Sequence, residues 1–171
     1  QFPNDVVIVG DAHEYLLHNY SDFDFIWSSP PCPTHSKMAL WTRHDKKYPD
    51  MMLYQEITLL QHIFKGKYIV ENVKAYYTPW IEPTTYQGRH CFWTNLKTPP
   101  IHIFDETTFK DSQGKGQFKG CNTLAKHEIL KWLGMPSFDK NIYLKGSNDP
   151  TKVARNCVNP KLGLMMVQEL V

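Results

Sequence analysis

Three residues able to do chemistry stand at the ends of apolar runs that we predict to be buried strands. They are Asp11, Cys32 and Glu71, and the runs are 5–10, 23–29 and 67–73. In open α/β sheets, ligands bind outside the carboxyl ends of the parallel strands. The sequence therefore predicts a site at this edge of the sheet, with a thiol as the candidate nucleophile and an acid on either side of it in the chain.

Cys32 is the most informative of the three. Pro30 and Pro31 precede it and restrict the backbone, which reduces the conformations open to the thiol. Such preorganisation suits a nucleophile, although cysteine is also commonly a buried packing residue. Asp11 has a second interpretation as a helix N-cap. Glu71 ends an apolar run, where a buried carboxylate needs a partner.

The order of the predicted elements favours an α/β fold with parallel strands. Between the strands we predict helices at 12–19 and 50–66, the second from apolar residues at helical spacing. Asp50 and Gly66 are the candidate caps of that second helix. After residue 73 the pattern predicts an antiparallel pair of strands at 89–95 and 101–104, followed by helices at 123–134 and 160–171.

Length and composition set the class of protein. The chain has 171 residues, which fits one domain at ~100–200 residues per domain, and its apolar fraction of 42% is enough for a core. The net charge of +2 excludes a strongly basic tail, and no run approaches the ~18 apolar residues of a membrane span. Without a signal-peptide pattern, we expect a cytoplasmic protein, or a nuclear one in a eukaryote, with no metal and no membrane partner.

Six segments in order along the chain resemble motifs of the cytosine-5 DNA methyltransferase family. Pro31-Cys32, with Ser36 four residues after the cysteine, resembles the catalytic motif, and Glu71-Asn72-Val73 matches the Glu-Asn-Val motif. The resemblance covers nearly the whole chain, and it implies a Rossmann-like, S-adenosylmethionine-dependent methyltransferase fold. The other similar segments are VVIVGDA at 6–12, Gln87-Gly88-Arg89-His90-Cys91, LAKHEILKWLGMPSFD at 124–139 and Asn156-Cys157-Val158-Asn159-Pro160.

The resemblance implies a reaction and the roles of its residues. Cys32 would attack carbon 6 of cytosine, so that carbon 5 becomes nucleophilic and takes the methyl group of S-adenosylmethionine. Glu71 would hydrogen-bond ring nitrogen 3 and the amino group, and Arg89 would hold the carbonyl at position 2. The base would be flipped out of double-stranded DNA into the pocket. The cofactor-binding positions implied by the resemblance are Asp11, Pro30, Asn156 and Val158.

Two polar loops carry cations that suit DNA phosphates. In the first, Trp41 is a candidate wedge for the gap left by the flipped base. Each loop also has an interpretation as an ordinary solvated loop. In that interpretation of the first loop, Trp41 packs on the core. The expected DNA contacts are Ser36, Lys37, Trp41 and Arg43 in the first loop, and Lys115 and Lys119 in the second.

The resemblance breaks at the front of the chain. Members of the family begin with a strand and a glycine-rich segment that hold the cofactor, and then a second strand, none of which precedes the run at 5–10. Within the motifs, Cys91 replaces the second arginine, and Arg155 and Asn159 replace a glycine and a proline. We therefore expect a single partial methyltransferase domain whose missing strands come from another segment or a second chain. Its parts would be a catalytic core at 1–95, a short target-recognition region at 96–122 and C-terminal helices at 123–171 that close the core.

Two other functions remain open from the sequence. The chain could be a catalytically inactive DNA-binding or regulatory subunit, or a fragment that needs a complementing N-terminal half, although Cys32, Glu71 and Arg89 are all retained. It could also be a cysteine hydrolase that uses Cys32 with His35 or another histidine. No local Cys–His signature supports the hydrolase.

Overall fold

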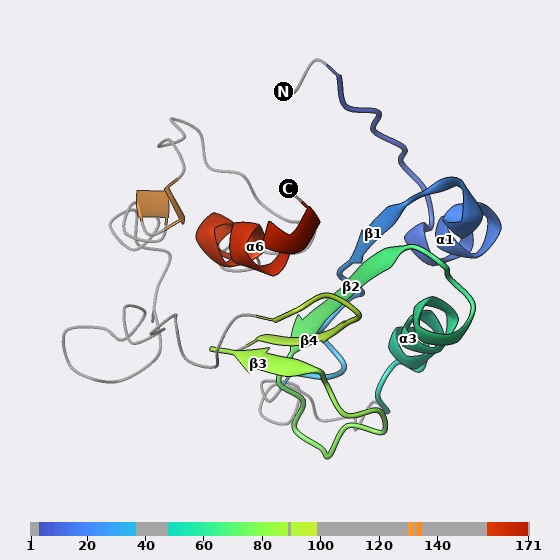
Figure 1. Ribbon diagram of the computed structural model, residues 1–171. Coiled ribbons are helices and arrows are strands. Elements are labelled where there is room, and N and C mark those ends of the chain that lie inside the picture. The colour runs from blue at the N-terminus through green and yellow to red at the C-terminus, as the bar shows by residue number, and fades with distance from the viewer. Residues whose placement is uncertain are drawn as a thin grey trace. The chain divides into compact units, whose positions relative to one another are not determined.

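The chain has an α/β structure, described here by a computed structural model and divided into two compact units, Gln1–Leu96 and Lys97–Val171. The first unit holds a sheet with its helices, and the second holds the helix α6 (Figure 1). The described residues are 4–36, 48–88, 90–98, 130–131, 133–134 and 157–170.

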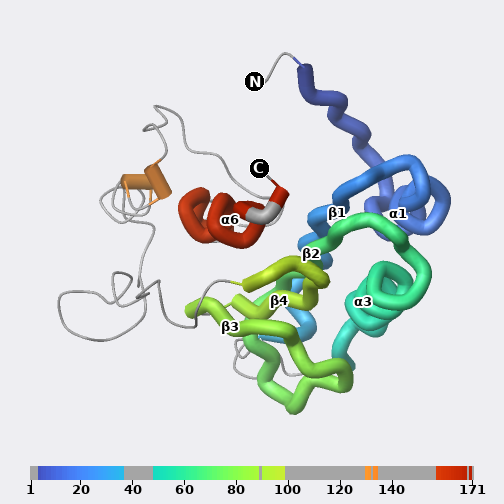
Figure 2. Tube along the Cα trace, viewed as in Figure 1, coloured from blue at the N-terminus to red at the C-terminus, as the bar shows by residue number. Residues whose placement is uncertain are grey.

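The first unit is built on a four-stranded mixed sheet in the order β1-β2-β4-β3. The parallel pairing of β1 with β2, predicted from the alternation of elements, is confirmed. β4 runs antiparallel to both β2 and β3, and the tube in Figure 2 shows the β3–β4 hairpin beside β2. The strands are β1 (Phe25–Ser28), β2 (Lys67–Val73), β3 (Thr85–Gln87) and β4 (His90–Thr94).

The helix α3 covers one face of this sheet. Its apolar stripe, including Leu53, Ile57 and Leu60, packs against Val70 of β2 and Trp93 of β4. This stripe has the helical spacing that predicted the element, and its burial is the main reason the helix forms here. The helices of the first unit are α1 (Ala12–Asn19), the short 3-10 helix η1 (Tyr20–Asp22) and α3 (Met52–His62).

The predicted caps of α3 are wrong. The N-cap is Met51, without a side-chain bond, and the C-cap is Ile63. Asp50, one residue before that N-cap, still accepts the backbone N–H of Met52 at 3.0 Å. Gly66 is required for space instead of a cap, because a Cβ there would overlap the carbonyl oxygen of Asp24.

The predicted strand at 5–10 is also wrong. Residues 5–9 have no regular structure. Their aliphatic side chains, from Val6 to Val9, are 59–96% exposed. An apolar run shows that side chains favour burial, but a strand forms only where a neighbouring strand offers its backbone groups. Among the described residues, none pairs with this segment, which leads from the N-terminus into α1 (Figure 1).

The strand β3, the described antiparallel partner of β4 in the hairpin, was not predicted from the sequence, whereas the other described elements agree with the prediction. β4 lies within the strand predicted at 89–95. The turn that leads from β3 into β4 includes Gly88, whose φ of 56° favours glycine. The described residues within 123–134 include helical Leu130, Lys131 and Leu133, while 101–104 lies outside the described residues.

The helix predicted at 160–171 is confirmed in its first part, as α6 (Pro160–Met166), and a 3-10 helix η3 (Gln168–Leu170) follows it. Asn159 is the N-cap of α6 and accepts the backbone N–H of Lys161 at 2.9 Å, a bond that a proline at this position could not provide. Over the described part of the chain, no helix has the length and apolar character needed to cross a membrane.

Candidate active site

The residues with candidate chemistry in the first unit gather where β1 and β2 end. The two strands are parallel neighbours with Ser28 opposite Val70. The segment that follows β1 and the last residues of β2 therefore leave the sheet at the same edge. Cys32 lies on the first segment, and Glu71 lies within β2, directly after the Val70 that is opposite the last residue of β1.

Asn72 fastens the loop that carries Cys32 to β2. Its Nδ2 donates a hydrogen bond to the carbonyl of Pro30 at 3.0 Å, and its Oδ1 accepts the backbone N–H of Val73 at 2.9 Å. The side chain is buried, so each of these bonds replaces one that water would otherwise make. The sequence showed Asn72 only as the middle of a motif; its role as a clamp becomes visible in the fold.

The far end of the Cys32 loop is held as well. The backbone N–H groups of His35 and Ser36 both donate to the carbonyl of Cys32 at 3.0 Å, which forms a tight turn. Ser36 then forms an isolated antiparallel bridge with Ala75, in the segment that follows β2. The thiol is therefore carried by a loop that hydrogen bonds fix on both sides, in addition to the two prolines.

Cys91 is a different kind of thiol from Cys32. Burial, together with the nearby charge of Glu71, raises the pKa of the Cys91 thiol to about 12. The thiol lies 3.3 Å from the carbonyl oxygen of Asn72, to which it can donate. It is therefore a protonated packing residue at neutral pH, whereas Cys32 is partly exposed. Of these two cysteines, Cys32 is the one that a substrate can reach.

The carboxyl of Glu71 is buried and pairs with His90 across the sheet. Oε1 of Glu71 and Nδ1 of His90 are 2.5 Å apart, and the two side chains are 11% and 5% exposed. In the antiparallel register, Phe92 stands opposite Glu71 and His90 stands opposite Val73, so Glu71 and His90 are diagonal neighbours on one face. Glu71 thus has the partner that a buried carboxylate needs, and nothing in the sequence pattern pointed to His90.

His35 does not form a dyad with Cys32. Its Nδ1 lies 2.5 Å from the hydroxyl of Tyr77, which in turn accepts the hydroxyl of Tyr54 at 3.3 Å. Its buried Nε2 has no hydrogen-bond partner among the described residues. Neither ring nitrogen of His35 therefore binds the thiol, which counts against a hydrolase that pairs Cys32 with His35.

The buried ring of His35 makes the stability of the fold sensitive to pH. Desolvation lowers the pKa of His35 from its ordinary 6.5, and the charge of Asp50 opposes this shift. The unfolded chain takes up a proton near pH 6.5 and the folded chain only at a lower pH, so stability is full above pH 6.5 and decreases as the pH falls below it.

We expect the free energy of unfolding, from urea denaturation, to decrease more between about pH 7.5 and about pH 5.5 in the natural chain than in a His35→Gln variant. The exposed His62 gives a matched control, because a His62→Gln variant should keep the slope of the natural chain. Equal slopes in the natural chain and in His35→Gln would contradict the assignment.

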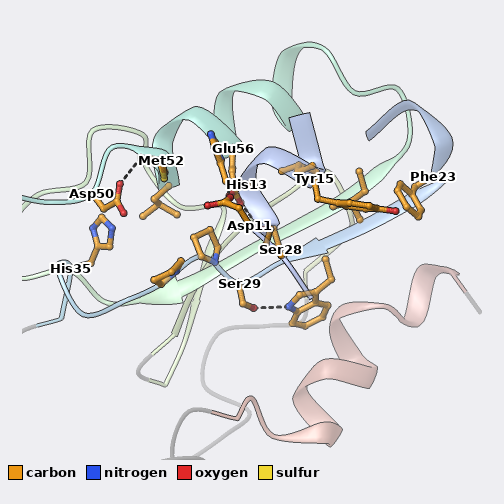
Figure 3. Close-up of a pocket in the computed structure, with 18 of the residues that line it drawn as sticks. Asp11, His13, Tyr15, Phe23, Ser28, Ser29, His35, Asp50, Met52 and Glu56 are labelled. Carbon is orange, nitrogen blue, oxygen red and sulfur yellow. Dashed lines mark hydrogen bonds and ion pairs between the residues drawn. The ribbon is translucent and has the colours of Figure 1, made fainter. Parts of the chain in front are cut away.

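A cavity of about 630 Å³ follows the open edge of β1 (Figure 3). Successive side chains of a strand point to opposite faces, and Ile26, Trp27 and Ser28 all line the cavity. It therefore reaches around the edge of the strand. Two of the four expected cofactor positions, Asp11 and Pro30, line it together.

Asp11 is at the same time the N-cap of α1, and its Oδ1 accepts the backbone N–H of Glu14 at 3.0 Å. The capping and ligand-lining interpretations of Asp11 are therefore compatible.

A buried polar cluster that the sequence did not predict lies in this cavity. Glu56 of α3 pairs through Oε1 with Nδ1 of His13 at 3.1 Å and accepts the hydroxyl of Ser28 through Oε2. The only signal for it was an acid within the apolar stripe of the predicted helix. Figure 3 shows this cluster between two ends of the cavity, with Tyr15 and Phe23 at one end and His35 and Asp50 at the other.

The remaining expected site residues are spread over the chain. Val158 lies in the second unit, directly before the N-cap of α6. Ser36 is described and forms the bridge to Ala75. The residues that lie outside the described part of the chain are Lys37, Trp41, Arg43, Arg89, Lys115, Lys119 and Asn156.

Comparison with known proteins identifies no relative: no protein-family model, no curated protein and no solved structure matches the chain.

Proposed function

We propose that the chain is the catalytic part of a DNA (cytosine-5) methyltransferase with a Rossmann-like fold. The observation that carries this proposal is the Asn72–Pro30 hydrogen bond, which ties the loop of Cys32 to the end of the strand that bears Glu71. A reachable thiol and a buried carboxyl on one rigid frame are suited to adding a nucleophile to a pyrimidine ring. The order of the six motifs along the chain supports the same reaction.

In the proposed reaction, the thiolate of Cys32 attacks carbon 6 of the flipped cytosine. As the sulfur–carbon bond forms, the electron pair of the ring double bond moves to carbon 5 and is shared with ring nitrogen 3. Glu71 donates the proton of its carboxyl in a hydrogen bond to nitrogen 3, which stabilises the negative charge there, and Arg89 holds the carbonyl at position 2. When bound, S-adenosylmethionine supplies the methyl group for carbon 5. Loss of the proton from carbon 5 then expels the Cys32 thiolate and restores the ring.

The cavity beside β1 fits the proposed cofactor in size and chemistry. Its volume of about 630 Å³ lies within the ~300–1,000 Å³ typical of small-molecule sites. Tyr15 and Phe23 offer aromatic rings to a purine, and the pair of His13 with Glu56 offers polar atoms to ribose hydroxyls. Asp11 and Pro30, which the family resemblance assigns to the cofactor, border the same space.

We also propose that a further segment or a second chain completes this cofactor site along β1. Among the described strands, β1 pairs only with β2, so one edge of β1 is open. Its residues are all partly exposed, whereas residues 68–72 of β2 are buried. The apolar side chains at 6–9 are exposed in the same unit. An open strand edge and a run of exposed apolar side chains are each an aggregation hazard that proteins normally cover.

The test of this completion is a titration. By isothermal calorimetry, we expect the isolated chain to bind S-adenosylmethionine only weakly. The reason is that the cavity residues, such as Asp11, Tyr15 and Pro30, form only one side of the proposed site. Addition of the completing segment should restore tight binding. Tight binding by the chain of 171 residues alone would contradict the need for a second segment.

The proposed reaction is tested with duplex DNA that carries tritium at carbon 5 of cytosine. After the thiolate adds to carbon 6, carbon 5 can take a proton from water in place of a methyl group. Elimination of the tritium and of the thiolate then returns cytosine. Tritium release into water therefore measures the addition step without any cofactor.

We expect release from DNA by the natural chain. Binding of DNA without release would favour the inactive DNA-binding subunit, and thiol-dependent cleavage of an ester in place of either result would favour the hydrolase.

A further inference from the structure

The contact between Glu71 and His90 fixes the position of the Glu71 carboxyl in addition to giving this buried group a partner. Nδ1 of His90 lies 2.5 Å from Oε1 of Glu71, and in the tautomer that carries its proton on Nδ1 the ring donates a hydrogen bond to this oxygen. The two residues come from adjacent antiparallel strands, β2 and β4, in a register that holds five residue pairs. This hydrogen bond therefore joins the candidate acid to the most constrained part of the sheet.

We propose that His90 is a positioning residue for the reaction: by holding Oε1 of Glu71, it sets the plane of the carboxyl that faces the flipped cytosine. This inference rests on the proposed function of Glu71. Ring nitrogen 3 and the amino group of cytosine lie side by side, and a carboxyl can serve them only in one orientation of its plane. His90 sets that orientation.

Glu71 needs such a constraint because its last torsion angle is intrinsically loose. The terminal sp³–sp² torsion of a glutamate has a broad distribution, so the strand alone does not fix the carboxyl plane. His90 is well placed to fix it. Its side chain is 5% exposed, and its ring lies 6.3 Å from that of Phe92, the residue opposite Glu71. Misplacing a reacting group by ~1 Å can cost ~10²-fold in rate.

The competing explanation is that the Glu71–His90 pair only stabilises the fold. Two substitutions of His90 with similar shapes distinguish this structural role from a positioning role. Asparagine at position 90 keeps an N–H donor near the position of Nδ1, whereas leucine has the same branching without a donor. In the tritium-release assay, we expect His90→Leu to lower the maximal rate by ~10²-fold with little change in the DNA concentration at half-maximal rate. We expect His90→Asn to remain within ~10-fold of the natural chain. Thermal unfolding of both variants reports any loss of fold.

The decisive measurement is a double-mutant cycle with Glu71→Ala, which removes the carboxyl that His90 is proposed to hold. In that background, we expect His90→Leu to have no further effect on the rate. Equal effects of His90→Leu with and without the Glu71 carboxyl would overturn the inference, and so would failure of asparagine to rescue a folded protein. Absence of tritium release by the natural chain would instead overturn the proposed function itself, so the two failures are distinguishable.

Discussion

Replacing Cys32 by serine is expected to abolish tritium release from cytosine in DNA, with a loss of ~10⁴-fold or more, the scale seen when the nucleophile of a covalent enzyme is removed. Serine keeps the shape of the side chain and the turn that starts at residue 32. Its hydroxyl is almost fully protonated at neutral pH, however, and is a far weaker nucleophile than a thiolate. The measurement is the rate of tritium release by purified Cys32→Ser, with DNA binding measured in parallel by fluorescence anisotropy.

The matched control is Cys157→Ser, because Cys157 is also partly exposed but lies in the second unit. That variant should release tritium at the rate of the natural chain. A second readout is a covalent adduct with DNA containing 5-fluorocytosine, in the presence of S-adenosylmethionine and the completing segment. Fluorine cannot leave carbon 5 as a proton does, so the bond to the thiol persists. Tritium release that survives in Cys32→Ser would contradict the proposed nucleophile.

Replacing Glu71 by glutamine is expected to lower the rate of tritium release by ~10²–10³-fold, the usual cost of losing one group that stabilises charge in the transition state. Glutamine preserves size and a hydrogen-bonding oxygen, so the effect isolates the ionisable carboxyl. Glu71 lies in the middle of the pairing between β2 and β4, and circular dichroism must therefore show an unchanged thermal transition in the variant.

Glu82→Gln is the control for this substitution, because Glu82 is exposed and accepts a hydrogen bond from the hydroxyl of Tyr86 at 3.0 Å. DNA affinity should be similar in both variants. A rate for Glu71→Gln within ~3-fold of the natural chain would show that the carboxyl does not act in the addition step.

These predictions depend on a frame whose main parts could be predicted from the sequence. The helices α1 and α3 and the strands β1, β2 and β4 follow local patterns, since apolar spacing reports which face of an element is buried. The strand predicted at 5–10 does not form, and the reason lies outside this segment of the sequence. The aliphatic side chains at 6–9 have the composition of a buried strand, yet no described strand pairs with them, so they are exposed.

The candidate site divides in the same way. Cys32 and Glu71 could be selected from the sequence, because each is a reactive residue type beside an apolar run and both fall in an ordered series of motifs. The groups that hold them could not be selected. Asn72 reaches Pro30 from another strand, and His90 reaches Glu71 across an antiparallel register. Both contacts depend on which strands are neighbours and how they are aligned.

The sequence by itself determined the type and order of most elements and singled out the candidate thiol and the candidate acid, because these are recorded in composition and spacing along the chain. The tertiary structure alone decided which side chains meet. Tertiary packing buries the Cys91 thiol and raises its pKa, and it pairs Glu71 with His90. It also forms the cavity along the free edge of β1. These features arise from contacts between residues distant in the chain, and such contacts exist only once the strands have paired and α3 has packed against them.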